Sequence, residues 1–304
     1  MESAKEPLIS VVMPSYNVAP YIGEAIESIL RQTITDFEFL IVDDGSSDQT
    51  PRIVQEHARH DARIRFFPMK HEGYAKMLRF GLSQARATLI ARMDSDDVSL
   101  PQRFARQIDY LKTNPDCVAV GSQVILTDPY GTPVESPKHP LAHAEIESDL
   151  LSGSGWAIVH PVVMMRREAV EAAGGYAQDL ELCEDVDLFL RLAEHGRLAN
   201  LPEVLLHYRQ HPTSVNHTRY AQQQRVLPTV IAAAYARRGR AMPADWKCPE
   251  RKVLPAVEQH RRWGWSALRL GKPSVARKHA FKVLRRMPLS LEAWRLTACA
   301  IRGY

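Results

Sequence analysis

Four apolar runs of strand length lie in the first hundred residues, and each ends at polar or turn-forming residues. They begin at Leu8, Phe37, Ile64 and Leu89. The segments between them carry apolar residues at helical spacing, for example across residues 22–30. Strand and helix therefore alternate, and such a chain is expected to form an α/β domain with a mostly parallel sheet and helices on both faces. Ligands of these sheets bind at the carboxyl ends of the strands.

The run from Leu89 leads directly into three carboxylates, those of Asp94, Asp96 and Asp97. Like charges repel, so a cluster of this kind favours a bound divalent cation, which prefers carboxylate oxygens. The alternative is a solvated turn in which Asp97 or Ser99 caps a helix that starts near Pro101. The same edge of the sheet is expected to carry residues that follow the other strands, namely Ser15, Asp43 and Asp44.

Asp43 and Asp44 stand where a strand meets Gly45. A plain strand-to-helix turn is one interpretation, because Asp, Gly and Ser are common turn formers. The other is a nucleotide site, since a carboxylate there can accept hydrogen bonds from a base N–H or from ribose hydroxyls. No glycine-rich phosphate motif is present, so phosphates would need a metal and cationic side chains. The cations available are Lys76, Arg79 and Arg92, of which the first two could equally be ordinary charges on a helix surface.

A helix predicted from Glu184 to His195 gives Asp185 a defined position. Apolar residues follow it at i+3, i+4 and i+7, so Asp185 begins the face that the helix buries. The helix dipole also favours a carboxylate in the first turn, which is the structural alternative. A carboxylate that leans toward the core has a raised pKa, and this suits a general base. Glu184 and Asp187 are expected to point elsewhere as solvated charges.

Histidines are weaker candidates for the site. His160 lies in an apolar stretch and is expected to be a core histidine with satisfied hydrogen bonds. His211 and His217 lie in a polar loop after a predicted strand. An imidazole there could complete a metal site begun by carboxylates.

The composition is that of a globular protein, with 45% hydrophobic and 24% charged residues in a chain of 304. No apolar run approaches the roughly 20 residues of a membrane span, and residues 1–7 lack the apolar core of a signal peptide. Four cysteines lie far apart without a CxxC pair. This pattern predicts reduced thiols in the cytosol and argues against a structural zinc site. We therefore expect a cytoplasmic protein.

The last fifth of the chain is strongly basic, although the formal net charge is only +4. Such an end could meet anionic lipid or nucleic acid. No nucleic-acid motif accompanies it, and a solvated helical face is the preferred interpretation. The helix formers after Met242 are faintly similar to a single tetratricopeptide hairpin, and one copy cannot form a solenoid. Residues 241–304 are therefore predicted to be a helical appendage, packed on a main domain of residues 1–240 or used in self-association.

Five motifs in order along the chain resemble those of glycosyltransferase family 2, the inverting enzymes of GT-A type that use nucleotide-sugar donors. They are SVVMPSYN at residues 10–17, FLIVDDGSSD at 39–48, ARMDSDD at 91–97, His-Pro at 160–161 and EDVDL at 184–188. The ARMDSDD form is most similar to bacterial transferases that build surface polysaccharides. The resemblance implies the GT-A fold, a Rossmann-like sheet with residues 1–97 as the nucleotide-sugar half and 98–240 as the acceptor half.

The resemblance also implies roles for individual residues. Asp96 is the central metal ligand, Asp94 flanks it, and His211 is a further ligand that approaches the metal or the diphosphate. Asp97 meets either the metal or the sugar and acceptor. Asp185 is the general base, in agreement with its position on the helix. The predicted donor-binding residues are Pro14, Ser15, Tyr16, Asp43, Asp44, Lys76, Arg79, Arg92, Asp94 and Asp97.

Two departures from the family pattern concern the donor. Residues 71–73 read His-Glu-Gly where the family commonly has Asn-x-Gly, and residues 78–81 read Leu-Arg-Phe-Gly where it commonly has Leu-Asn-x-Gly. The Gln-x-x-Arg-Trp motif of processive members is absent. Addition of a single sugar is therefore expected.

The expected reaction transfers one hexosyl or N-acetylhexosaminyl group from a nucleotide-diphosphate sugar, preferentially a UDP-sugar, to an acceptor hydroxyl with Mn²⁺ or Mg²⁺. The acceptor is expected to be a saccharide or a lipid-linked saccharide. The basic helices would contact the inner face of the plasma membrane or form a homo-oligomer. One alternative is a sugar nucleotidyltransferase, which would carry a Gly/Arg/Lys-rich loop where this chain has PSYN. The other is a non-catalytic nucleotide-binding scaffold, which a complete set of carboxylates disfavours.

Overall fold

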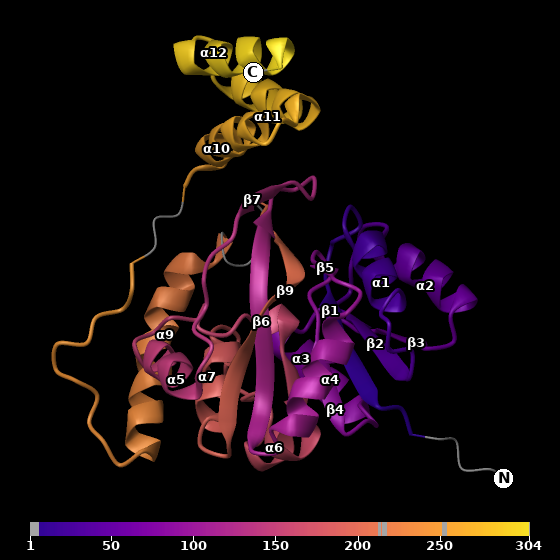
Figure 1. Ribbon diagram of the computed structural model, residues 1–304, viewed down its shortest axis with the longest axis vertical. Coiled ribbons are helices and arrows are strands. Elements are labelled where there is room, and N and C mark those ends of the chain that lie inside the picture. The colour runs from indigo at the N-terminus through magenta and orange to yellow at the C-terminus, as the bar shows by residue number, and fades with distance from the viewer. Residues whose placement is uncertain (1–5, 212–213, 215–217, 251–253, 304) are drawn as a thin grey trace. The chain divides into compact units, whose positions relative to one another are not determined.

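The computed structural model describes residues 6–211, 214, 218–250 and 254–303 (Figure 1). The chain separates into two compact units. The first unit comprises residues 1–124, 138–207 and 221–249. The second comprises residues 125–137, 208–220 and 250–304. The second unit thus includes two segments, 125–137 and 208–220, that lie before the predicted domain boundary at residue 240. The predicted division into domains 1–240 and 241–304 stays a prediction.

One sheet runs through the α/β part in the order β3-β2-β1-β4-β8-β6-β9-β5, with β7 paired to β6. Its first four strands in space are parallel, and the pairs β4–β8, β6–β8 and β5–β9 are antiparallel. The α/β prediction with a mostly parallel nucleotide half is therefore confirmed. The strands are β1 Ile9–Ser15, β2 Phe37–Asp43, β3 Ile64–Pro68, β4 Leu89–Arg92, β5 Val98–Ser99, β6 Cys117–Thr127, β7 Pro133–Glu135, β8 Met164–Arg166 and β9 Arg197–Arg209.

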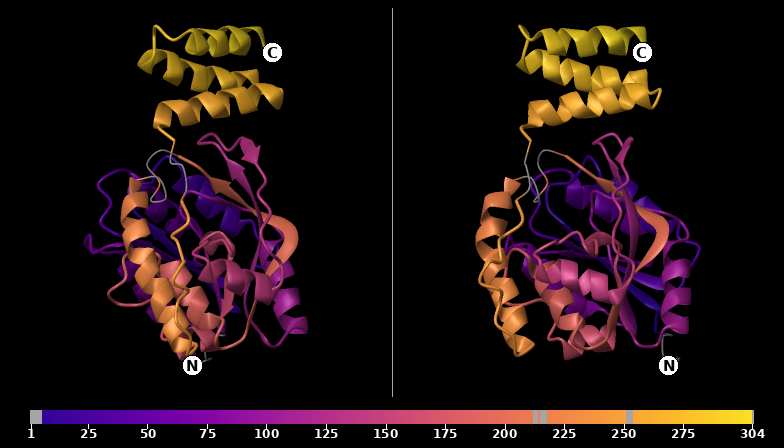
Figure 2. Two further views of the ribbon diagram at one scale, coloured as in Figure 1. Left: turned by 90° about the vertical axis from the view of Figure 1, so that its left-hand side faces the viewer. Right: turned by 60° about the vertical axis from the view of Figure 1, so that its left-hand side comes forward.

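Helices cover both faces of this sheet (Figures 1 and 2). Their buried faces follow the apolar spacing; in α1, for example, Ile22, Ala25, Ile26 and Ile29 are buried. Helix α3 packs on β1 and β2. The helices of the α/β part are α1 Ile22–Leu30, α2 Thr50–His60, α3 Tyr74–Gln84, α4 Arg103–Thr113, α5 His143–Leu151, α6 Arg167–Ala172, α7 Glu184–Leu192 and α9 Tyr220–Arg237, with a 3₁₀ turn η1 at His160–Val162.

The capped-turn interpretation of the Asp94–Asp97 segment is wrong. Helix α4 begins at Arg103, and its N-cap residue, Gln102, makes no side-chain cap hydrogen bond. Ser99 lies instead in β5, where its amide donates to Ser28 Oγ at 3.0 Å. The segment between β4 and α4 therefore continues the sheet rather than starting the helix.

The second unit contains three C-terminal helices, α10 Ala256–Arg269, α11 Pro273–Arg286 and α12 Leu291–Arg302. Small residues dominate their common core, including Ala267, Ala276, Ala280 and Ala300. The β6–β7 hairpin joins the same unit through a fully buried side-chain contact, because His279 Nε2 lies 2.9 Å from Asp128 Oδ2. Among the described residues, no helix has both the length and the apolar character that crossing a bilayer requires.

Candidate active site

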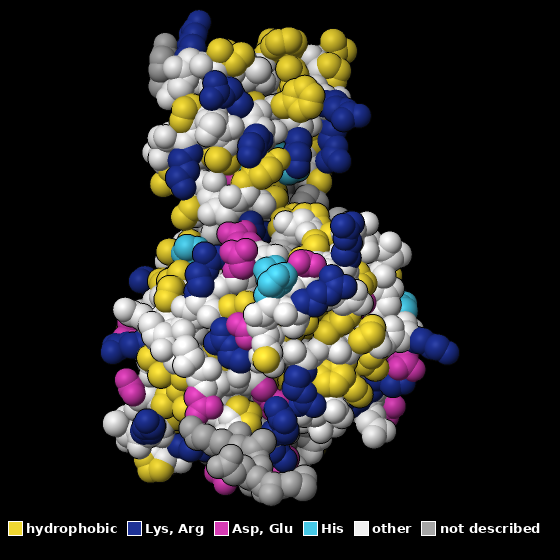
Figure 3. Space-filling view, turned by 90° about the vertical axis from the view of Figure 1, so that its right-hand side faces the viewer, with side chains coloured by type: hydrophobic (Ala, Val, Ile, Leu, Met, Phe, Trp, Pro, Cys, Tyr) yellow, Lys and Arg dark blue, Asp and Glu magenta, His cyan; other side chains and the backbone are white. Residues whose placement is uncertain are grey.

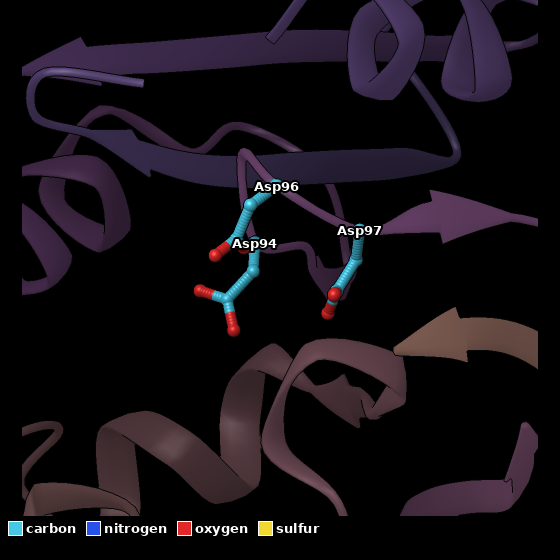
Figure 4. A group of neighbouring side chains, drawn as sticks. All are labelled: Asp94, Asp96 and Asp97. Atoms are coloured by element: carbon cyan, nitrogen blue, oxygen red, sulfur yellow. The ribbon is translucent and has the colours of Figure 1, made fainter. Parts of the chain in front are cut away.

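Three carboxylates meet in the loop that follows β4, residues 93–97, which is called the aspartate loop below (Figure 4). The chain leaves the sheet after Met93, whose amide still donates to Val12 O at 3.1 Å, and turns into β5. One oxygen from each of Asp94, Asp96 and Asp97 lies within 4.8 Å of the others. Three oxygen ligands at this spacing suit a hard divalent cation, so the predicted metal residues of this loop are brought together.

Arg92 holds Asp94 in place from inside the protein. Its guanidinium is 1% exposed, and Nη2 donates to Asp94 Oδ1 at 2.6 Å. Tyr74 completes the arrangement, because its hydroxyl contacts Arg92 and donates to Asp94 Oδ1 at 3.2 Å. Burial, together with the charge of Asp96, raises the pKa of Asp94, while Arg92 acts in the opposite direction. Asp94 is thus oriented by two side chains, of which only Arg92 was a predicted site residue.

Asp43 and Asp44 lie at the end of β2, almost completely buried, and both are fixed by hydrogen bonds. Asp43 accepts from Ser15 Oγ at 3.0 Å and from the amide and hydroxyl of Ser46 at 2.9 and 2.6 Å. Asp44 accepts from the backbone amides of Glu72 at 2.8 Å and Gly73 at 3.1 Å. Ser15 pairs with Asp43 in the register of β1 and β2, so the predicted donor residues of these two strands do meet at one edge of the sheet.

Residues 71–73, in which His71 stands where the family commonly has Asn, contact Asp44 through backbone and side chain. Gly73 has φ +100, a conformation that favours glycine, and this lets the segment turn its amides toward Asp44. His71 Nδ1 lies 2.8 Å from Asp44 Oδ2, and its ring stacks on Tyr16 at 4.5 Å between centroids. In the sequence, His71 stands out only as a departure from the family pattern, and its contact with Tyr16 was not predicted.

Helix α7 places Asp185 half-buried in its first turn, after Cys183 in a left-handed conformation at φ 61. Burial raises the pKa of Asp185, as the helical face predicted, and the charges of Arg92 and Asp94 also act on it. Asp185 therefore lies within electrostatic range of the aspartate loop. Its Oδ1 accepts from the Val186 amide at 2.8 Å.

The prediction that Glu184 and Asp187 are solvated is wrong. Glu184 is 7% exposed, and burial raises its pKa well above the usual range, with the charge of Asp185 adding to the effect. Asp187 is 8% exposed and pairs with Arg191 at 2.5 Å. Helix α7 packs against both α5 and α6, so more than one of its faces is covered.

The remaining candidates are less closely tied to the loop. Lys76 pairs with Glu72 at 2.7 Å on the surface of α3, and Arg79 donates to Ala177 O at 2.9 Å. The contact of Lys76 matches the helix-surface alternative, whereas Arg79 is half-buried and bonds to a segment that is distant in sequence. A role for either cation in donor binding stays a prediction. His160 is a core histidine as expected, since its Nε2 shares a 2.7 Å hydrogen bond with Tyr176 and burial lowers its pKa well below the usual value.

His211 is buried and belongs to the second unit, whereas the aspartate loop belongs to the first. Its role as a metal ligand stays a prediction. His217 lies outside the described residues. Pro14 precedes Ser15 at the end of β1, and Tyr16 follows with 44% of its side chain exposed.

Comparison with known proteins agrees with this geometry. The model of the family described as glycosyl transferase family 2 matches residues 10–174. The chain belongs to glycosyltransferase family 2. It is 31% identical over 218 residues to the O-antigen biosynthesis glycosyltransferase WbnJ of Escherichia coli, an alignment that covers 70% of this chain and 84% of WbnJ. The chain spans 66% and 64% of the length of two other curated relatives that it matches.

Two solved structures show the same fold at low sequence identity. Residues 1–349 of Staphylococcus aureus TarS, in complex with UDP-GlcNAc, superpose with a TM-score of 0.62 at 18% identity, covering 96% of this chain and 79% of that one. The mannosyltransferase PcManGT of Pyrobaculum calidifontis, in complex with GDP-Man and Mn²⁺, gives a TM-score of 0.55 at 20% identity, covering 99% of this chain and 81% of that one. The predicted glycosyltransferase fold is thereby confirmed.

Proposed function

We propose that this family 2 member is a metal-dependent, inverting glycosyltransferase that moves one sugar from a nucleotide-diphosphate sugar to an acceptor hydroxyl. The observation that carries the proposal is the convergence of the three carboxylates of the aspartate loop, together with Asp185, whose pKa is raised by burial and by the charge of Asp94. A carboxylate beside a cation-binding loop supplies the two elements that such a transfer needs, a proton acceptor and a site for the diphosphate.

The donor we propose is a UDP-sugar, and the acceptor a saccharide or lipid-linked saccharide in polysaccharide biosynthesis. TarS, which shares the fold, is described in complex with UDP-GlcNAc. WbnJ, a relative across most of its length, is described as an O-antigen biosynthesis enzyme. The described cysteines are free, which fits a reducing compartment, and we therefore place the reaction in the cytoplasm.

The residues of the aspartate loop fit a divalent cation such as Mn²⁺ or Mg²⁺. All three offer carboxylate oxygens, which are the ligands that hard cations prefer. Asp94 accepts from Arg92 and Tyr74, and we propose Asp96, the central carboxylate of the family motif, as the principal ligand. When bound, the cation neutralises the charge that develops on the leaving diphosphate. PcManGT, which shares the fold, is described with Mn²⁺.

The chain's own residues account for the remaining steps. Tyr16, stacked on one side by His71, offers its exposed ring to the nucleobase, and Asp44 stands beside this pair. Asp185 removes the proton from the acceptor hydroxyl, whose oxygen attacks the anomeric carbon on the side opposite the diphosphate. The new glycosidic bond forms as the bond to the diphosphate breaks, and the configuration inverts. The raised pKa of Asp185 makes it a stronger proton acceptor than an ordinary aspartate.

Replacement of Asp185 by Asn tests the proposal. Turnover of a UDP-sugar should fall about 10²–10⁴-fold, because the general base is lost. Nucleotide affinity, measured by calorimetry with Mn²⁺, should change little, since Asp185 acts on the acceptor. Asp187→Asn is the matched control: it lies on the same helix and can still accept from Arg191, so turnover should be retained. Near-normal turnover in Asp185→Asn would remove Asp185 from the mechanism.

A further inference from the structure

The three C-terminal helices carry a charge opposite in sign to that of the rest of the chain. Residues 256–302 contain eleven Lys or Arg and two Glu, whereas the whole chain contains 39 and 35. The remainder therefore holds 28 basic and 33 acidic residues. Both glutamates of the helices, Glu258 and Glu292, pair with Arg261. The excess of positive charge is thus left for the surface of α10–α12.

Large apolar side chains are exposed on the same helices. Figure 3 shows hydrophobic side chains beside Lys and Arg side chains over the C-terminal helices. Seven of the ten large hydrophobic residues that are exposed in the described chain fall in this region; they are Leu270, Phe281, Met287, Leu289, Leu291, Trp294 and Ile301. Most exposed apolar residues of a soluble protein are scattered singly, so this concentration indicates a binding surface.

Helix α12 is apolar on two different faces. Ala293, Leu296 and Ala300 are buried against the rest of the helical core. A second set lies at positions i, i+3, i+7 and i+10, which places its members along one side of the helix, about 15 Å in length. This apolar stripe consists of Leu291 (87% exposed), Trp294 (55%), Ala298 and Ile301 (67%). Arg295 and Arg302 follow stripe residues by four positions and therefore flank the stripe.

We propose that the apolar stripe of α12 and its flanking arginines bind an anionic lipid surface. A helix that lies in a membrane interface buries Trp and aliphatic side chains at the level of the headgroups and keeps its cations among the lipid phosphates. The stripe supplies the apolar contact, and the eleven basic residues of positions 256–302 supply the attraction to negative charge. This inference does not rest on the proposed transfer reaction.

Charge complementarity favours lipid over the other occupants of such a face. A second copy of the chain, docked through the same stripe, would bring Arg295 and Arg302 of both copies together, and like charges across an interface are costly. A nucleic acid would use the basic residues through its phosphates but would gain little from exposed Leu and Ile side chains. Only an anionic apolar surface uses both properties of the helix.

Vesicle flotation of the full chain tests the proposal. The protein should float with vesicles of phosphatidylcholine mixed with phosphatidylglycerol, should float poorly with phosphatidylcholine alone, and should bind less in high salt. Combined Leu291→Ser, Trp294→Ser and Ile301→Ser should lower partitioning at least roughly tenfold through loss of apolar burial. Arg295→Ala and Arg302→Ala should each lower it about fivefold. All these side chains are exposed, so thermal unfolding should confirm that the variants remain folded.

Matched controls lie in the first unit. Leu141→Ser removes an apolar side chain of 43% exposure, and Arg52→Ala removes an exposed cation; neither should change flotation. Equal flotation of the triple variant and the original chain would overturn the proposal. So would a dimer in solution that the stripe variants dissociate while vesicle binding is absent. Binding to duplex DNA that the triple variant retains, again without vesicle binding, would assign the charge to nucleic acid and would also overturn it.

Discussion

At the scale of single residues, the proposed roles of Asp94 and Asp96 in the aspartate loop differ. Arg92 and Tyr74 both contact Asp94, whereas Asp96 stands on the same loop with its carboxylate beside that of Asp94 (Figure 4). The ion pair with the buried Arg92 neutralises part of the negative charge of Asp94, so less of that charge acts on a bound ligand. Because Asp96 is proposed as the principal metal ligand, its loss should weaken metal binding.

Asp96→Ala should lower the affinity for UDP in the presence of Mn²⁺ by at least roughly tenfold, to the level seen without metal. Calorimetric titration with and without Mn²⁺ measures both values. Asp109→Ala, which removes an exposed carboxylate on α4, is the control and should bind UDP as the original chain does. Affinity in Asp96→Ala that still rises on addition of Mn²⁺ would show that the metal is held elsewhere.

The sequence predicted the chemical type of the candidate site residues better than it predicted how far their side chains are buried. The apolar spacing placed Asp185 on the buried side of its helix, yet its side chain is half-buried, whereas its neighbours Glu184 and Asp187 are buried. Glu184 and Asp187 were misplaced because the same pattern reveals only the most apolar face. Helix α7 is packed by α5 and α6 as well, and these neighbours come from other parts of the chain. His71 and Tyr74 were missed for a related reason, since only folding brings them to Asp44 and Asp94.

At the scale of elements, the packing of α3 on the sheet depends on Gly81. A Cβ at this position would lie 2.5 Å from Val12 Cγ1 of β1 and 3.6 Å from Val42 Cγ2 of β2. The helix therefore approaches the strands at a distance that only glycine allows. Residues 78–81 thus have the glycine of the family pattern at a position where close packing requires it, although Arg79 stands where the family commonly has Asn.

Gly81→Ala should lower the free energy of unfolding by about 1–3 kcal/mol through overpacking. Gly23→Ala in α1 is the matched control, because its Cβ would meet nothing nearer than 3.9 Å. That change should raise the free energy of unfolding by about 0.5–1 kcal/mol, since alanine is the better helix former. Denaturation in urea measures both. Equal effects of the two substitutions would contradict the close approach of α3 to the sheet.

Helices and strands that neighbouring residues define were predicted well. Strands that exist only through pairing with a segment distant in sequence were not. The first four strands and the helices between them match the predicted order, because apolar runs and helical spacing are properties of neighbouring residues. The apolar stretch around His160 contains no boundary that the sequence reveals, but it forms the 3₁₀ turn η1 and then enters the short strand β8. Strand β5 has two residues and exists through its pairing with β9, which local sequence cannot reveal.

At the scale of the whole chain, the second unit is built from segments that are far apart in sequence. Its buried link between Asp128 and His279 joins residues separated by 151 positions. His279 in turn shares a 3.0 Å hydrogen bond with His260 through their Nδ1 atoms. The sequence indicated a helical appendage from its composition, but composition carries no information on which distant hairpin would complete its core.

This network should make the second unit sensitive to acid. Burial, followed by the charge of His279, lowers the pKa of His260 to about 4, with Lys282 and Arg286 acting in the same direction and Asp128 opposing them. Between pH 6.5 and pH 4 the unfolded chain therefore binds a proton at His260 that the folded unit does not, so stability falls as the pH is lowered. The loss reaches about 3 kcal/mol near pH 4. The pKa of Asp128 is also lowered: burial raises it, but hydrogen bonds, including the one with His279, outweigh that effect. The stability that the Asp128 carboxylate contributes is therefore lost only at still lower pH.

Replacement of His260 by Phe should remove this part of the pH dependence. The variant is expected to be less stable than the original chain at pH 7, because His279 loses a hydrogen-bond partner, but its stability should fall less between pH 6.5 and pH 4. Thermal unfolding followed by circular dichroism across this range measures the difference in slope. His60→Gln, at a histidine with 74% of its side chain exposed, should leave the slope unchanged. Parallel stability curves for His260→Phe and the original chain would mean that His260 is already protonated in the folded unit, and that the buried link between hairpin and helices survives acid.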